Sequence, residues 1–224
     1  MSLDGRISEW LRREPATLQA EFNEAIVGEV PERILPGPPV GDSLSIAPLS
    51  PGADPIATSA VTVAATGSTP PGLSLRAHVG HPFVTFQAGE ARPGISNYLV
   101  TWTGASTIAR SAELNILVMS GHAASGVLLK MRGGQFLVGR DEVPIGTYRP
   151  LEEHTVLIAV DLDAGSYNLT IHRTGASSLQ VADLPLIADL SPYRYLELAF
   201  FWGSREPPTN EILYVDNVVI TGTE

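Results

Sequence analysis

From residue 58 onward the sequence is a near-unbroken succession of short alternating runs, rich in β-branched and aromatic residues and separated by Gly, Pro, Asp or Ser. Such runs are typical of β-strands, in which successive side chains point to opposite faces. The expected strands lie at 18–23, 43–48, 58–64, 73–79, 83–88, 97–103, 112–120, 126–132, 135–139, 155–162, 167–173, 195–202 and 212–221. About thirteen strands are too many for an immunoglobulin-type sandwich. No clear linker divides residues 73–224, so we predict one large all-β domain of two packed antiparallel sheets.

The clearest turn signal is VDLDAGSYNL, in which two alternating runs flank Asp163-Ala164-Gly165-Ser166. Asp favours the start of a turn, and Gly165 can adopt the positive φ that a bulged hairpin loop requires. This stretch predicts a β-hairpin.

Before residue 18 the sequence has a different character. Ile7, Trp10 and Leu11 would share one face of a short helix over residues 4–14, which Pro15 would end. We expect residues 1–17 to be an N-terminal arm packed on the main body, or the end of an interdomain helix of a longer protein. The opening Met-Ser-Leu is typical of a vector remnant, and 18–224 is the predicted domain.

Charge and composition exclude several functions. The formal net charge is −10 with only 14 Lys and Arg residues, scattered along the chain, so a nucleic acid or an anionic membrane is not an expected partner. No apolar run reaches the 18 residues that a membrane-spanning helix needs. The chain has no cysteine, which excludes disulfides and thiolate metal sites.

Three segments carry a resemblance to a known family. They are AEFNEAIVGEVPE near the start, HTVLIAVDLDAGSYNLTI in the middle and LYVDNVVI near the end. These resemble the opening strand, a central hairpin and the closing strand of concanavalin A-like jelly rolls, the group that includes legume lectins, laminin-G-like modules, glucanases and many carbohydrate-binding modules. The resemblance implies a two-sheet jelly-roll sandwich whose first and last strands pair.

The closing run ILYVDNVVIT interrupts its apolar pattern with Asp216 and Asn217. Neighbouring residues of a strand point to opposite faces, so one of these two polar side chains should face inward and need partners. We expect Asp216 either to hydrogen-bond with the first strand, where Glu21 and Asn23 are available, or to bind a structural calcium ion. No other cofactor is expected.

Several polar residues alternate with apolar residues on four of the expected strands. If these strands adjoin on the concave sheet, their outward side chains line a groove. The members of this groove would be Asn97, Glu113, Asn115, Lys130, Arg132, Tyr195 and Glu197.

The glucanases of the resembled group carry a Glu-x-Asp-x-x-Glu string on one strand, and no such string occurs here. Glycosidases need two carboxylates roughly 5–9.5 Å apart, and Glu113 with Glu197 is the pair that the groove would offer. A plain solvated face is the other alternative.

We therefore expect a non-catalytic β-sandwich module that binds a neutral polysaccharide or a protein partner, with no catalytic residue assigned. The alternative is a polysaccharide hydrolase or lyase with an atypical site on the concave face. We expect this module to belong to an extracellular or cell-surface bacterial protein whose signal peptide is not part of this sequence, and a cytoplasmic location stays open.

Overall fold

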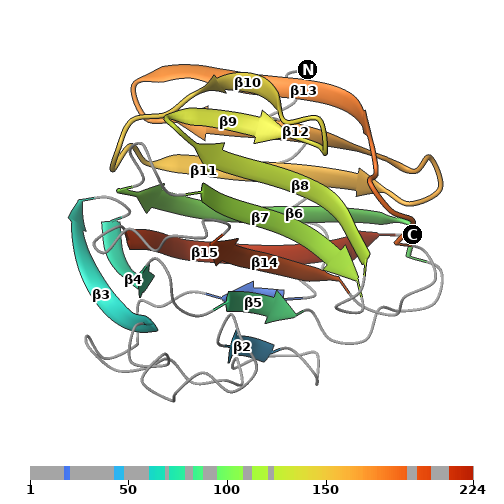
Figure 1. The fold of residues 1–224 in the computed structure, drawn as a ribbon. Coiled ribbons are helices and arrows are strands. Elements are labelled where there is room, and N and C mark those ends of the chain that lie inside the picture. The colour runs from blue at the N-terminus through green and yellow to red at the C-terminus, as the bar shows by residue number, and fades with distance from the viewer. Residues whose placement is uncertain are drawn as a thin grey trace.

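The computed structural model shows two antiparallel β-sheets packed against each other (Figure 1). It describes residues 18–20, 43–47, 61–68, 71–78, 83–87, 95–107, 113–120, 124–190, 196–202 and 212–223. Every regular element within these residues is a strand, fifteen in all. The predicted antiparallel sandwich is confirmed. The expected helix over 4–14 lies outside the described residues, and a domain boundary at residue 18 stays a prediction.

The first sheet, called here the eight-stranded sheet, has the order β13-β12-β11-β6-β15-β4-β3, with β1 also paired to β15. Its strands are β1 (Leu18–Ala20), β3 (Val61–Ser68), β4 (Pro71–His78), β6 (Asn97–Ser106), β11 (His154–Asp161), β12 (Ser166–Arg173), β13 (Ala176–Pro185) and β15 (Ile212–Thr223).

The second, seven-stranded sheet has the order β10-β9-β8-β7-β14-β5-β2. Its strands are β2 (Ser43–Ala47), β5 (Phe83–Gln87), β7 (Glu113–Ser120), β8 (Ala124–Arg132), β9 (Gln135–Val138), β10 (Val143–Thr147) and β14 (Glu197–Trp202).

Two of these strands, β10 and β13, were not expected from the sequence. Each forms one end of its sheet, and most of their residues are exposed or half-buried. A strand at a sheet edge tolerates Pro and Gly and needs no continuous apolar face. The sequences VPIGT and ASSLQVADLP therefore lack the alternation that identified the other strands.

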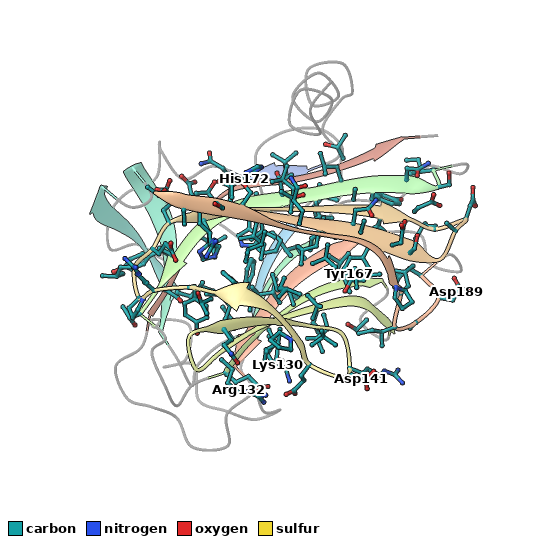
Figure 2. The ribbon with its side chains drawn as sticks, turned by 90° about the horizontal axis from the view of Figure 1, so that it is seen from above. Lys130, Arg132, Asp141, Tyr167, His172 and Asp189 are labelled. Atoms are coloured by element: carbon teal, nitrogen blue, oxygen red, sulfur yellow. The ribbon has the colours of Figure 1, made fainter. Side chains whose placement is uncertain are left out.

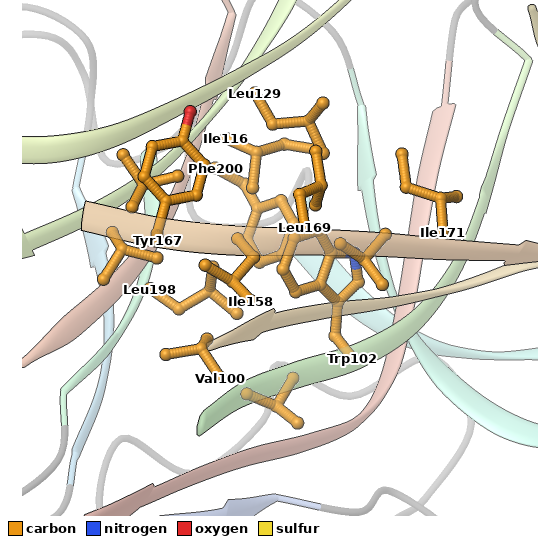
Figure 3. Close-up of a cluster of buried hydrophobic side chains, with 14 of the residues drawn as sticks. Val100, Trp102, Ile116, Leu129, Ile158, Tyr167, Leu169, Ile171, Leu198 and Phe200 are labelled. Carbon is orange, nitrogen blue, oxygen red and sulfur yellow. The ribbon is translucent and has the colours of Figure 1, made fainter. Parts of the chain in front are cut away.

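The core lies between the sheets and follows the alternation of the sequence. Trp102 of β6 and Phe200 of β14 meet across it edge to face, with ring centroids 5.6 Å apart and an interplanar angle of 88° (Figure 3). Edge-to-face contact is a favoured arrangement of aromatic rings. The side chains of β7 and β8 that were expected to face inward are all buried: Leu114, Ile116, Val118, Val127, Leu129 and Met131.

The predicted hairpin joins β11 to β12. Asp161 pairs with Ser166, and the Asp161 Oδ1 atom accepts a hydrogen bond from the backbone N–H of Ala164 at 2.8 Å. Gly165 has a φ of 64°, the left-handed conformation for which glycine was expected there. The loop comprises residues 162–165, one position earlier than the sequence suggested.

Strand β15 brings the two ends of the fold together. One of its edges pairs with β6, and the other pairs first with β4, through residues 212–215, and then with β1, through residues 218–220. The expected pairing of the first and last strands is thereby confirmed for residues 18–20.

Asp216 and Asn217 lie where β15 changes its partner from β4 to β1. The register with β6 shifts here by one residue, and Asn217 has a φ of 50°. This β-bulge inserts one extra residue, so Val215 before it and Val218 after it are both buried in the core. The polar pair thus marks a bulge, and Asn tolerates the left-handed conformation better than most residues do.

At one edge the two sheets close on each other. A Cβ atom added to Gly146 of β10 would lie 2.4 Å from the Cδ1 atom of Leu179 in β13, so the leucine packs directly on the glycine. The Arg173 Nη1 atom of β12 also donates a hydrogen bond to the backbone carbonyl of Thr147 at 2.8 Å. These contacts fix β10 to the eight-stranded sheet.

His154 is a buried titratable group at the start of β11, with 2% of its surface exposed. Its Nδ1 atom lies 3.2 Å from the Glu152 carbonyl oxygen, and its ring packs edge to face on Phe136 with centroids 5.6 Å apart. Burial lowers the pKa of His154 to about 4, and the contact with Glu152 offsets this only in part. The folded protein therefore keeps this ring neutral.

We predict that His154 makes the fold sensitive to mild acid. The unfolded chain binds a proton on this residue near pH 6.5 but the folded chain only near pH 4, so the stabilisation is complete above pH 6.5 and decreases as the pH falls toward 4. The total loss should be about 3 kcal/mol in the free energy of unfolding. Urea unfolding at pH 4.5, 5.5 and 7.5 measures it. His154→Gln should flatten this dependence, and His172→Gln, which removes a histidine from the outer face of the eight-stranded sheet, is the matched control. Equal pH slopes for wild type and His154→Gln would contradict the assignment.

Candidate functional site

The outer face of the seven-stranded sheet brings together four of the residues predicted to line a groove. Glu113 of β7 lies opposite Arg132 of β8, and Asn115 lies opposite Lys130. All four point away from the core because the residues between them on each strand are buried in it. Figure 2 shows Lys130 and Arg132 on the outer side of one layer, with Tyr167 between the layers.

Two carboxylates and two cations form a closed network on this face, called here the ion-pair cluster: Glu113, Lys130, Arg132 and Glu142. The Lys130 Nζ atom lies 3.1 Å from Glu113 Oε1 and 2.6 Å from Glu142 Oε1. The Arg132 guanidinium contacts Glu113 Oε2 at 3.1 Å and also pairs with Glu142. The Asn115 Nδ2 atom donates a further hydrogen bond to Glu113 Oε1 at 3.2 Å. Each cation therefore bridges both acids.

The ion-pair cluster is partly withdrawn from water. The exposed fractions of the side chains are 12% for Lys130, 19% for Glu113, 32% for Glu142 and 44% for Arg132. Asn115 is buried although it points outward, with 4% of its surface exposed. Ion pairs at such positions are screened less by water and salt than fully exposed pairs are. Within the cluster, Lys130 and Glu113 are therefore better shielded than Glu142 and Arg132.

The charges within the ion-pair cluster hold one another in the ionised state. Burial raises the pKa of Glu113, but hydrogen bonds from Lys130 and Asn115 and the charges nearby outweigh this and lower the pKa below its usual 4.5. Hydrogen bonds from Lys130 and Arg132 likewise lower the pKa of Glu142. Burial lowers the pKa of Lys130, but its contacts with Glu142 and Glu113 raise it above 10.5 overall. At neutral pH the cluster is fully ionised, and its two positive and two negative charges cancel.

Glu142 was not predicted from the sequence. It belongs to the turn between β9 and β10, where its backbone N–H donates to the Gly139 carbonyl at 3.3 Å. Its φ is 53°, in the left-handed region that few side chains adopt. The only sequence signal was an acid in a short Gly-Arg-Asp-Glu turn, and such turns usually carry polar residues because they face solvent.

Asn97 does not belong to this site, which corrects the predicted groove. It begins β6 in the eight-stranded sheet, where it lies opposite Asp161 of β11 and Thr223 of β15. Its Nδ2 atom donates to the Ser96 hydroxyl at 3.1 Å. The alternation of the sequence correctly predicted that Asn97 points away from the core, but alternation carries no information on which sheet a strand joins.

The predicted carboxylate pair of Glu113 and Glu197 is also wrong. The backbone of Glu197 lies opposite Met119 of β7, six residues along that strand from Glu113. At about 3.3 Å per residue the two positions are roughly 20 Å apart, beyond the separation that glycosidases use. Tyr195 lies outside the described residues.

A closer pair of acids does exist within the ion-pair cluster. Glu113 and Glu142 both contact the Lys130 ammonium, so their nearest oxygens lie at most about 6 Å apart, below the upper limit of roughly 9.5 Å for glycosidases. A general acid, however, needs a raised pKa so that it is protonated at neutral pH. Both of these pKa values are lowered, so the pair is arranged for ionic contact and hydrogen bonding.

Asp216, the expected metal ligand, lies on the other sheet from this cluster. Only 1% of its surface is exposed, and its Oδ2 atom accepts a hydrogen bond from Asn217 Nδ2 at 3.3 Å. Glu21 and Asn23, the expected partners on the first strand, lie outside the described residues. Among the residues that the structure describes, no group of three or more His, Asp or Glu is placed to hold a metal ion. That same part of the chain contains no helix long and apolar enough to span a membrane.

Three solved structures illustrate the similarity in fold. The catalytic domain of a glycoside hydrolase family 131 protein from Coprinopsis cinerea has a TM-score of 0.62 at 12% identity, over 92% of this chain and 93% of that chain. The lectin UEA-II complexed with galactose has a TM-score of 0.56 at 9% identity, over 94% of this chain and 100% of that chain. A sialidase has a TM-score of 0.57 at 12% identity over 93% of this chain, which spans only 19% of the sialidase.

No family model and no curated protein matches the sequence. At these low identities the similar structures bear on the fold, and they include a lectin as well as a glycoside hydrolase. Together with the two antiparallel sheets and the pairing of the first and last strands, they show that the chain has a two-sheet jelly-roll sandwich fold, which confirms the fold expected from the sequence.

Proposed function

We propose that the chain is a non-catalytic glycan-binding module and that its ligand, a neutral polysaccharide, binds over the ion-pair cluster. The observation that carries this proposal is the convergence of Glu113, Asn115, Lys130 and Arg132 on one outward face. An extracellular or cell-surface location belongs to the same proposal, and a protein partner on this face is the competing kind of ligand.

The chemistry of the face suits sugar hydroxyls. A hydroxyl donates one hydrogen bond and accepts others, so its recognition needs fixed donors beside fixed acceptors. Glu113 supplies acceptor oxygens, and Arg132 supplies donors on a guanidinium that is 44% exposed. Their mutual contacts hold both side chains in place, which reduces the entropy lost when a ligand binds.

The charge of the face favours a ligand without charge. The two positive and two negative groups of the ion-pair cluster cancel, and the whole chain carries a formal charge of −10. A polyanion would therefore meet long-range repulsion from the protein and no excess of positive charge at the site.

Hydrolysis or β-elimination of a polysaccharide is the alternative function. Two observations favour it: the similarity in fold to a family 131 catalytic domain, and the short separation of the Glu113 and Glu142 carboxylates. Against it stand the lowered pKa values of both acids, because neither would be protonated to act on a leaving group.

We predict that Arg132→Gln weakens binding to a neutral polysaccharide by about tenfold or more, since it removes charge-assisted donors from the exposed part of the site. The matched control is Arg140→Gln, which removes the same charge from the neighbouring β9–β10 turn. Affinity electrophoresis in a panel of neutral polysaccharides measures the retention, and a melting curve for each variant verifies the fold. Equal retention of wild type and Arg132→Gln would place the ligand elsewhere.

The same polysaccharides should yield no reducing ends and no unsaturated products after prolonged incubation with the wild-type protein. Turnover that disappears in Glu113→Gln, while Asp141→Asn retains it, would replace the binding function with the enzymatic one.

The calcium ion expected at Asp216 remains a prediction. If calcium binds there, EDTA should lower the melting temperature and added calcium should restore it, with no such response in Asp216→Asn. If Asp216 is only a hydrogen-bonding residue, EDTA has no effect. Asp216→Ala should then still destabilise the fold by roughly 1–3 kcal/mol, because it leaves buried polar partners unsatisfied.

A further inference from the structure

We propose that Glu142 determines the ligand specificity of the outer face, by occupying both cations of the ion-pair cluster and so keeping carboxylate-bearing sugars out. This inference rests on the proposed glycan-binding function and assigns a role to a residue outside the predicted groove. In physical terms, the Glu142 carboxylate stands where the carboxylate of a uronic acid would otherwise bind.

The two acids of the cluster make the same contacts but from different kinds of position. Glu113 begins β7, and its partner Arg132 faces it directly in the neighbouring strand β8. Glu142 reaches the same Lys130 and Arg132 from a turn. Lys130 already has Glu113 as a counterion at 3.1 Å, and Glu142 adds a second, closer contact at 2.6 Å. The strand acid alone thus gives each cation a partner, and the turn acid is the additional one.

The turn holds Glu142 in an uncommon conformation. Its φ of 53° costs free energy for a residue with a Cβ atom, and such strain persists only where the surrounding structure enforces it. The base of the β9–β10 hairpin is held by the contact of Leu179 with Gly146 and by the hydrogen bond from Arg173 to Thr147. Because the base of the hairpin is fixed, the turn at its other end places Glu142 in contact with Lys130 and Arg132 of β8.

The charge of the site depends on this one residue. With Glu142 in place the cluster is neutral, whereas without it two cations would share the single carboxylate of Glu113. An Arg beside a Lys then offers an incoming carboxylate a bidentate partner and a second charge. Glu142 is also the more exposed of the two acids, at 32% against 19%, so it borders the space from which a ligand approaches.

The test is a binding experiment on the whole chain with a linear galacturonate tetramer and with cellotetraose, by isothermal titration calorimetry at low and at physiological salt. The variants are Glu142→Gln and Glu142→Gly, the second because glycine accepts the positive φ without strain. The matched control is Asp141→Asn, which removes one negative charge from the same turn. Asp141 is exposed, and Figure 2 shows it on the same outer side of the molecule as Lys130 and Arg132.

We expect both Glu142 variants to bind the galacturonate tetramer at least about tenfold more tightly than wild type, with a gain that shrinks as salt rises. Asp141→Asn should change this affinity by less than about twofold, since it alters only the general field of the protein. No gain in either Glu142 variant, an equal gain in Asp141→Asn, or tight galacturonate binding by wild type would overturn the inference.

The outcome is separable from that of the proposed function. Binding of cellotetraose and other neutral glycans by wild type tests the proposed function, whereas the gain for galacturonate is a comparison between variants. Melting curves verify that each variant is folded. If Glu142→Gln fails to fold, Glu142→Gly decides the result because its backbone is unstrained at this position.

Discussion

The register between β7 and β8 is the constraint on which the candidate site depends. Leu114 faces Met131 and Ile116 faces Leu129 across these strands, and all four side chains are buried in the core. Because side chains alternate along a strand, the register of the apolar residues also determines which residues lie opposite each other on the outer face. Glu113 must then lie opposite Arg132, and Asn115 opposite Lys130. A slip of one residue would bury the charges and expose the leucines, so the packing of the core itself maintains the contacts of the outer face.

The sequence correctly predicted which side chains point into the core and which point out. It predicted only in part which of the outward side chains lie next to one another. Alternation is a local property, and it correctly divided β6, β7 and β8 into inward and outward residues. The order of strands in a sheet depends on contacts between distant parts of the chain, and here Asn97 was placed in the wrong sheet. Which residue of β7 lies opposite Glu197 of β14 depends on the register between these two strands. The strands are far apart in the sequence, so no local pattern encodes that register. Glu142 was missed because a turn has no periodicity, and the edge strands β10 and β13 because exposed strands need no apolar face.

Asp216 and Asn217 interrupt the apolar alternation of the last strand, and this interruption coincides with a feature of the sheet topology. Two adjacent polar residues in an apolar strand violate its alternation, and the expected cause was a clasp to the first strand or a metal ion. The structure places them at a bulge, at the point where β15 exchanges one neighbouring strand for another. The extra residue resets the alternation so that Val215 and Val218 are both buried. The polar pair is thus explained by topology, whatever further partners Asp216 has.

The ion-pair cluster also bears on the choice between binding and hydrolysis as the function of this face. A pair of carboxylates at a suitable distance is necessary for hydrolysis, but the acids must differ in pKa so that one is protonated and the other is not. Here Lys130 and Arg132 contact both acids and lower both pKa values, so neither acid is favoured in its protonated form. Replacing the two cations with neutral residues would leave two partly desolvated carboxylates close together, and mutual repulsion would raise the pKa of one of them. The cations of β8 are therefore the feature of this face that favours the proposed binding function over hydrolysis, and it is a feature of the site and not of the fold.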